Sequence, residues 1–239
     1  ILVLARPQTT NKWQNSEIEG IDIMLAIDVS TSMLAEDLKP NRLEAAKDVA
    51  AEFINGRPND NIGITLFAGE TFTQCPLTVD HAVLLDMIHN IKCGLITDGT
   101  AVGMGIANAV TRLKDSKAKS KVIILLTDGT NNKGDISPMT AAEIAKSFGI
   151  RVYTIGVGTN GMAPYPYPVG NTVQYVSMPV EIDEKTLTEI AGTTDGNYFR
   201  ATSNSKLKEV YEEIDKLEKT KLNVKEYSNC LLYTSPSPR

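Results

Sequence analysis

The chain has 239 residues, of which 42% are hydrophobic and 22% are charged. These proportions are typical of a globular protein with one substantial core, and no stretch approaches the about 18 consecutive apolar residues of a membrane span. The formal net charge of −5 argues against a nucleic-acid-binding surface, because phosphate binding needs a basic face. We therefore expect one domain whose partners are proteins or cations.

The two ends of the chain differ from the part between them. Residues 1–20 start without an initiator methionine, and we expect an N-terminal segment that follows a missing membrane helix or, equally, a buried edge segment. Residues 21–220 are expected to form the domain, and residues 221–239 a C-terminal extension. The final stretch, 230–239, fits neither helical nor strand periodicity, so we interpret it as non-native sequence.

Strand-like and helix-like segments alternate along the first half of the chain. Residues 21–29 form a nearly continuous apolar run, as expected of a strand buried on both faces of a parallel sheet. The segments predicted after it are a helix between Pro40 and Gly56, strands at 61–68 and 71–78 that pair as a hairpin, a helix capped by Asp80, a helix opened by Thr100, and a strand at 121–127.

The alternation continues in the second half. The predicted segments are a helix from Ser137 and Pro138 to Gly149, a strand at 151–157, a short helix capped by Asp183, an edge strand at 198–201, and a final helix with apolar residues from Leu207 to Leu217. Residues 158–170 contain three prolines and several glycines, so we expect an irregular surface loop there.

This order of segments predicts an α/β fold. We expect a doubly wound, mainly parallel central sheet with helices on both faces and one antiparallel edge strand. In such sheets, ligands bind beyond the carboxyl ends of the strands.

That rule places five polar side chains at one edge of the predicted sheet. Asp28, Ser30 and Ser32 follow the first strand, Thr100 lies in a loop that opens a helix, and Asp128 follows the strand at 121–127. Hard oxygen ligands of this kind suit a divalent cation. Other interpretations remain open, because Asp, Ser and Thr are also common turn and cap residues. Thr100 is then a helix cap, or Asp98 faces the site in its place.

The three segments together resemble the von Willebrand factor A domain. They are Asp28-Val-Ser-Thr-Ser32, Asp98-Gly-Thr-Ala101 and Thr127-Asp-Gly129, and the resemblance covers about residues 21–217. It implies a metal-ion-dependent adhesion site (MIDAS). Hydroxyl oxygens are then offered to the ion by Ser30, Ser32 and Thr100. Asp28 and Asp128 approach the ion directly or through water. Asp98 remains a candidate for supporting these ligands without contacting the ion.

Mg²⁺ is the expected occupant, with Mn²⁺ or Ca²⁺ as alternatives. It takes about six oxygens at about 2.0–2.1 Å and keeps several waters, so hydroxyls with few carboxylates suit it better than they suit calcium. In the resembled family the open position of the ion accepts an acidic side chain of a partner protein.

Longer strings resemble the A-type members of the bacterial aerotolerance (Bat) proteins. They include Phe67-Ala-Gly-Glu70, Gln74-Cys-Pro-Leu-Thr78, Lys119-Ser-Lys-Val-Ile-Ile-Leu-Leu-Thr-Asp-Gly129 and Tyr153-Thr-Ile-Gly-Val-Gly158. The resemblance implies an inner-membrane protein whose A domain faces the periplasm. It also implies partners, namely a second A-domain Bat protein, tetratricopeptide-repeat (TPR) Bat proteins and a MoxR-type AAA+ ATPase. This chain departs from the pattern because it lacks the flanking membrane segments.

We expect a metal-dependent protein-binding module that captures an acidic side chain, and not an enzyme. The alternatives are a metal-assisted phosphohydrolase and a scaffold with an empty site. Against the phosphohydrolase, Ser30 stands where an aspartyl-phosphate enzyme needs a general acid two residues after its nucleophile. Residues 161–170 and 70–76 are both candidates for the frame of the binding surface.

Overall fold

The structure is a computed structural model that describes residues 20–94, 96–128, 131–159, 161–169, 172–180 and 182–233. Within these residues a six-stranded sheet has the order β3-β2-β1-β4-β5-β8, and β6 and β7 form a separate pair. The strands are β1 (Asp22–Asp28), β2 (Asn61–Phe67), β3 (Thr71–Thr78), β4 (Lys121–Thr127), β5 (Ile150–Val157), β6 (Gly161–Val169), β7 (Thr172–Val180) and β8 (Tyr198–Ala201).

The predicted fold class is confirmed. β1 pairs in parallel with β2 and β4, β4 with β5, and β5 with β8, whereas β3 runs antiparallel to β2 at one edge. Every residue of β1 is buried, which is why its sequence is an apolar run and not an alternating one.

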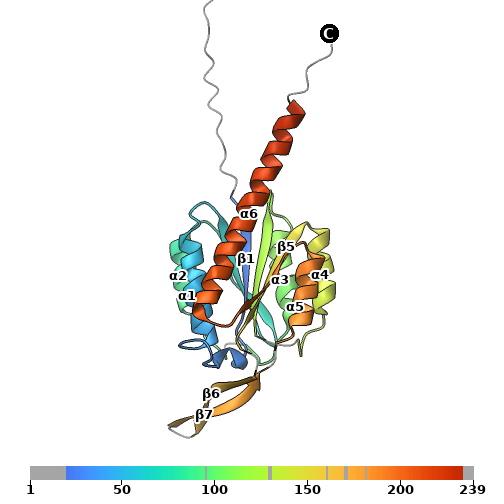
Figure 1. Ribbon diagram of the computed structural model, residues 1–239. Coiled ribbons are helices and arrows are strands. Elements are labelled where there is room, and N and C mark those ends of the chain that lie inside the picture. The colour runs from blue at the N-terminus through green and yellow to red at the C-terminus, as the bar shows by residue number, and fades with distance from the viewer. Residues whose placement is uncertain are drawn as a thin grey trace, which may run out of the picture.

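Helices cover both faces of this sheet (Figure 1). They are η1 (Thr31–Leu34), α1 (Arg42–Asn55), α2 (His81–His89), α3 (Val102–Leu113), α4 (Pro138–Ser147), α5 (Glu184–Thr193) and α6 (Asn204–Tyr233). One core lies between the sheet and α1, α2 and α6, and the other between the sheet and α3, α4 and α5. Alternate residues of β1 serve the two cores, with Leu25 in the first and Met24 in the second.

Short polar side chains set the starts of several helices, as predicted. Asp80 accepts a hydrogen bond from the Val83 N–H, and Ser137 and Asp183 cap α4 and α5 in the same way. The cap interpretation of Thr100 is wrong, because Ala101 occupies the N-cap position of α3 and no side chain caps it. The Thr100 hydroxyl is therefore not used as a helix cap.

The prediction of an irregular loop at 158–170 is also wrong, since residues 161–169 form β6. Its partner β7 was not predicted at all. The prolines at 164, 166 and 168 all lie at alternate positions of β6 and so share one parity along the strand. A strand tolerates proline wherever the missing N–H would point away from its partner.

The C-terminal helix α6 continues to Tyr233 and projects beyond the body (Figure 1). The first part of the stretch that fits no periodicity, residues 230–233, is therefore helical. The expected segment at residues 1–19 and the last part of the tail, residues 234–239, lie outside the described residues. No helix within the described part of the chain combines the length and the apolar composition that crossing a membrane requires.

Candidate metal centre

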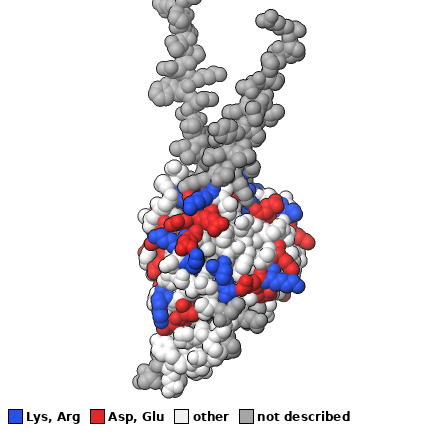
Figure 2. Space-filling view, in the orientation of Figure 1, with Lys and Arg blue, Asp and Glu red and all other residues white. Residues whose placement is uncertain are grey.

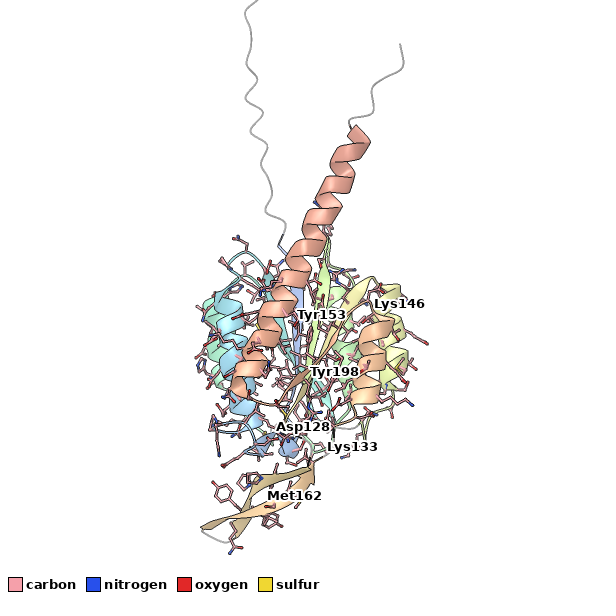
Figure 3. The ribbon with its side chains drawn as sticks, in the orientation of Figure 1. Asp128, Lys133, Lys146, Tyr153, Met162 and Tyr198 are labelled. Carbon is pink, nitrogen blue, oxygen red and sulfur yellow. The ribbon has the colours of Figure 1, made fainter. Side chains whose placement is uncertain are left out.

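The site lies where β1 and β4 end side by side. Register pairs Ile27 with Leu126, so Asp28 is level with Thr127 and Asp128 is one residue further on. The chain leaves β1 toward α1 on one face and leaves β4 toward α4 on the other. This divergence is the topological switch point of an open α/β sheet, where ligands bind. Figure 3 labels Asp128 and Lys133 at this end of the sheet.

Asp28 is fully buried, and two hydrogen bonds fix its carboxylate. Its Oδ1 accepts from the Ser30 N–H at 2.9 Å, which closes the turn after β1. Its Oδ2 accepts from the Thr127 hydroxyl at 2.7 Å, which ties it to the neighbouring strand. The Asp28 side chain therefore has one defined orientation.

A chain of hydroxyls connects this turn to Asp128. The Oγ atoms of Ser30 and Ser32 are 3.0 Å apart, and the Ser32 hydroxyl donates to Asp128 Oδ1 at 2.9 Å. Ser30 and Asp128 are buried, whereas Ser32 is exposed. The cluster therefore reaches solvent at Ser32.

Thr100 and Asp98 come from the adjacent loop before α3. Thr100 is 4% exposed, and its N–H donates to Asn132 Oδ1 at 2.9 Å. Asp98 is exposed and accepts from the Thr31 N–H at 3.1 Å and from the Thr31 hydroxyl at 3.0 Å. Asp98 thus links its loop to the Asp28–Ser32 turn and engages Thr31. This arrangement fits a supporting role better than a place among the ligands.

Sequence reasoning missed the buried Arg42, which lies behind Asp128. Its Nη1 donates to Asp128 Oδ2 at 2.6 Å, and its Nε and Nη2 donate to the two oxygens of Asp37 at 2.7 and 2.6 Å. Asp37 Oδ2 also accepts from the Thr159 N–H at 2.8 Å. Asp128 is therefore joined through Arg42 and Asp37 to the end of β5.

A signal for Arg42 was present in the sequence. Arg42 is the first residue of α1, and a positive charge in the first turn of a helix interacts unfavourably with the helix dipole. A residue at such an unfavourable position, directly after Asn41, indicates a partner elsewhere. That partner is the pair of carboxylates at Asp37 and Asp128.

The electrostatics of the cluster favour an additional cation. The guanidinium of Arg42 pairs with two carboxylates, those of Asp37 and Asp128, and the Asp28 carboxylate adds a third acid to the cluster through its charge interaction with Asp128. Burial, reinforced by the charge of Asp128, raises the pKa of Asp28 from 3.8 to about 7. Burial also raises the pKa of Asp128, although Arg42 and Ser32 oppose the increase. The pKa of the nearby Cys93 thiol rises to about 12 through burial and the charges of Asp28 and Asp128, so this group stays neutral.

The donor set is one of hydroxyls with two acids. Within the described ranges, no group of three or more His, Cys, Asp or Glu side chains is placed to hold a metal ion. Transition-metal sites rich in histidine or thiolate are therefore a poor comparison, and hard oxygen chemistry of the Mg²⁺ type fits these residues.

Comparison with known proteins identifies the family. The family model of the von Willebrand factor type A domain matches residues 22–213. The chain belongs to this domain family. The predicted recognition is thus confirmed, and the match covers the whole sheet described above.

Two curated relatives extend this assignment. An uncharacterized protein of Borreliella burgdorferi is 28% identical over 227 residues, which are 94% of this chain and 67% of the relative. A UPF0353 protein of Mycolicibacterium paratuberculosis is 30% identical over 206 residues, which are 81% of this chain and 59% of the relative. The chain thus spans about three fifths to two thirds of the length of these relatives.

Solved structures include aerotolerance proteins. BatB from Bacteroides thetaiotaomicron superposes with a TM-score of 0.74 at 35% identity, covering 84% of this chain and 100% of that one. An aerotolerance-related membrane protein from Bacteroides fragilis superposes with a TM-score of 0.71 at 34% identity, covering 82% of this chain and 100% of that one. Mussel proximal thread matrix protein 1, solved with a zinc-occupied MIDAS motif, gives 0.65 at 25% identity, covering 83% of this chain and 46% of that one.

Proposed function

We propose that this A domain is a metal-dependent protein-binding module. Asp28, Ser30, Ser32, Thr100 and Asp128 hold a divalent cation, with Mg²⁺ as the expected ion and Mn²⁺ or Ca²⁺ as alternatives. An acidic side chain of a partner protein completes the coordination. The zinc-occupied MIDAS motif of the mussel relative supports this assignment.

The observation that carries the proposal is the charge balance of the buried cluster. Asp28 and Asp128 are both almost inaccessible, with exposed fractions of 0% and 2%. The one guanidinium at the cluster is shared by Asp37 and Asp128, and Asp28 accepts its described hydrogen bonds from the neutral donors Ser30 and Thr127. Buried charges in proteins are paired or bound to metals. A divalent cation supplies the missing positive charge.

The same geometry favours binding over catalysis. Both oxygens of Asp28 already accept hydrogen bonds, from Ser30 and Thr127, so this carboxylate is held in place and is a poor nucleophile. A phosphohydrolase of this kind needs a proton donor two residues after its nucleophile. Ser30 occupies that position, and its hydroxyl bonds with the hydroxyl of Ser32. We propose that the domain is not an enzyme.

The relatives support a membrane-associated setting for this binding activity. BatB and the aerotolerance-related membrane protein both cover more than four fifths of the chain. We propose that the full-length protein is anchored in the inner membrane with its A domain in the periplasm. There it assembles with other Bat proteins of the A-domain and TPR types and with a MoxR-type AAA+ ATPase, in a complex linked to aerotolerance.

Calorimetric titration of the purified chain with Mg²⁺ or Mn²⁺ tests the site. We expect one ion per chain, with heat lost in Asp28→Asn and retained in Asp86→Asn, which makes the same charge change on the exposed face of α2. Equal binding by all three proteins would contradict the assignment, as would no binding by the unaltered chain.

A second titration tests the acidic partner. With a Bat-type A-domain protein as the titrant, binding should require the metal and disappear in chelator. Binding that is indifferent to chelator would overturn the adhesion mechanism, and an empty-site scaffold would explain it. Hydrolysis of a generic phosphoester that is lost in Asp28→Asn would favour the phosphohydrolase instead.

A further inference from the structure

The β6–β7 hairpin projects from the body at the end of the sheet that carries the metal centre (Figures 1 and 3). Its described backbone hydrogen bond to the body runs from the Glu36 N–H to the Pro164 carbonyl at 2.9 Å. The consecutive β7 residues 174–178 are all exposed, including Tyr175 at 61% and Met178 at 46%. Both faces of β7 therefore meet solvent.

The two outer edges of this hairpin differ chemically. In an antiparallel ladder, alternate residues direct their N–H and C=O groups outward. The Pro164 carbonyl bonds Glu36 outside the ladder, so the parity of 164, 166 and 168 points outward. All three residues are prolines, and the outer edge of β6 thus offers no N–H groups at these positions. Proline in an edge strand blocks the addition of another strand.

The outer edge of β7 is open by the same reasoning. Register pairs Pro164 with Ser177, Pro166 with Tyr175 and Pro168 with Val173. The outward N–H and C=O groups of β7 are therefore those of Val173, Tyr175 and Ser177. Within the described residues the sheet of this hairpin has two strands, and β7 pairs only with β6. Three donors and three acceptors in a row form a template for one more strand.

The chemistry of this edge indicates what can add to it. Residues 161–180 contain no charged side chain, although the chain as a whole has 24 basic and 29 acidic residues. The lower end of the molecule in Figure 2, where the hairpin lies, is correspondingly free of red and blue. The hairpin residues themselves therefore add no like-charge repulsion when two copies of this edge meet, and the acid beside this edge is Glu36 of the body, which hydrogen-bonds with the Tyr175 side chain. The outward residues are also spaced evenly about Tyr175, so a two-fold axis through Tyr175 pairs Val173 of one copy with Ser177 of the other.

We propose that β7 pairs antiparallel with β7 of a second copy of this chain. The product is a four-stranded sheet in the order β6-β7-β7-β6, with up to six backbone hydrogen bonds across its centre and both outer edges blocked by proline. Such a two-fold contact closes on itself and stops at the dimer. Because stable interfaces bury about 1,000 Å² or more and this one is a short strand pair, the dimer is weak and forms at high local concentration.

Sedimentation equilibrium over a concentration series up to about 1 mM tests the proposal. Ser177→Pro removes an outward donor opposite Pro164 and leaves the β6–β7 ladder intact, whereas Ser177→Ala removes the hydroxyl and keeps the N–H. We expect Ser177→Pro to weaken dimerisation at least about tenfold, because two of the six hydrogen bonds are lost. Ser177→Ala should match the unaltered chain.

Three results would overturn the proposal. They are a monomer at all concentrations, a dimer unaffected by Ser177→Pro, and equal weakening by Pro and Ala. Circular dichroism checks that Ser177→Pro is folded. A variant that needs no proline gives an independent test, since Tyr175→Cys should be cross-linked between copies by a short bis-maleimide while Ser147→Cys, exposed at the end of α4, should not. Equal cross-linking of both would contradict the pairing.

Discussion

Asp28 illustrates a conflict between stability and binding at a single residue. Its burial and the neighbouring Asp128 raise its pKa to about 7, so the folded chain binds this proton more tightly than the unfolded chain does. Stability therefore decreases as the pH rises from about 4 to about 7. A cation bound to the folded chain would offset this cost, so metal binding would increase the free energy of unfolding.

Asp28→Asn should stabilise the metal-free protein at pH 8, because a neutral amide has no charge to desolvate. We expect a gain of about 1–3 kcal/mol in the free energy of unfolding in chelator, which shrinks toward zero at pH 4, where Asp28 is protonated. Urea unfolding at both pH values measures it. Asp86→Asn is the control, and a loss of stability at pH 8 in Asp28→Asn alone would contradict the prediction.

Gly158 lies against the guanidinium of Arg42. It has a φ of +122°, and a Cβ there would lie 2.5 Å from Arg42 Cζ. Gly158→Ala should therefore cost about 2 kcal/mol or more of stability and weaken metal binding by displacing Arg42 from Asp128. Gly192→Ala in α5, where a Cβ meets nothing within 4 Å, should be neutral or slightly stabilising. Equal unfolding midpoints in urea for the two variants would refute this.

At the residue scale, short motifs carried the prediction only part of the way. Asp28, Ser30, Ser32 and Asp128 are linked by hydrogen bonds as the carboxyl-end rule suggests. Arg42 was not predicted as part of the site. Its partner in the site, Asp128, is 86 residues away in sequence, and a pairing over that distance depends on the fold. The role of Asp28, Ser30, Ser32 and Asp128 as metal ligands remains a prediction.

At the scale of elements, one acid anchors α6 to the sheet. Glu218 is 1% exposed and accepts hydrogen bonds from Tyr153 at 2.6 Å, from Ser120 at 2.8 Å and from Arg151; Tyr153 is labelled in Figure 3. Burial alone would raise the pKa of Glu218, but the hydrogen bonds from Arg151 and Tyr153 outweigh it and lower the pKa below 4.5. The helix is thus held most firmly when this group is ionised.

Glu218→Gln should destabilise the protein by about 2–4 kcal/mol at pH 7, because it leaves Arg151 without its counter-charge. The stabilisation by Glu218 is present above its unfolded pKa and is lost as the pH falls through the lower folded pKa. The difference between the two proteins should therefore shrink below about pH 4.5. Thermal unfolding across this range measures it, with Glu212→Gln on the exposed side of α6 as the control. A difference independent of pH would argue against the linkage.

Most elements were predictable because burial imposes simple patterns on them. β1 and β4 each have an uninterrupted apolar centre, residues 23–27 and 122–126, and α4 carries its cap and first-turn proline. The β6–β7 hairpin was not predictable. The sequence shows where the prolines are, but it does not show whether an N–H at each of these positions would have pointed toward the partner strand or away from it. The end of α6 at Tyr233 was not predicted either.

On the scale of the whole molecule, the β6–β7 hairpin is a separate two-stranded pair, and we expect the six-stranded sheet with its helices to fold without it. Gly161 and Val180 face each other in register. Replacing residues 162–179 with Asn-Gly should therefore close a tight turn and change the unfolding temperature by no more than about 3 °C. Differential scanning calorimetry measures the change. Metal binding should persist, and loss of folding would show that the hairpin belongs to the core.

Arg42 has one more consequence, which concerns ionic radius. Its guanidinium holds Asp128 Oδ2 at 2.6 Å, so a large ion clasped by both oxygens of Asp128 would be pressed against a fixed positive charge. Calcium, with six to eight ligands, commonly takes such two-oxygen carboxylate grips, whereas magnesium manages with single oxygens and water. If the proposed site binds an ion, we therefore expect the buried arginine to favour the smaller magnesium over calcium, although the arginine itself would touch neither.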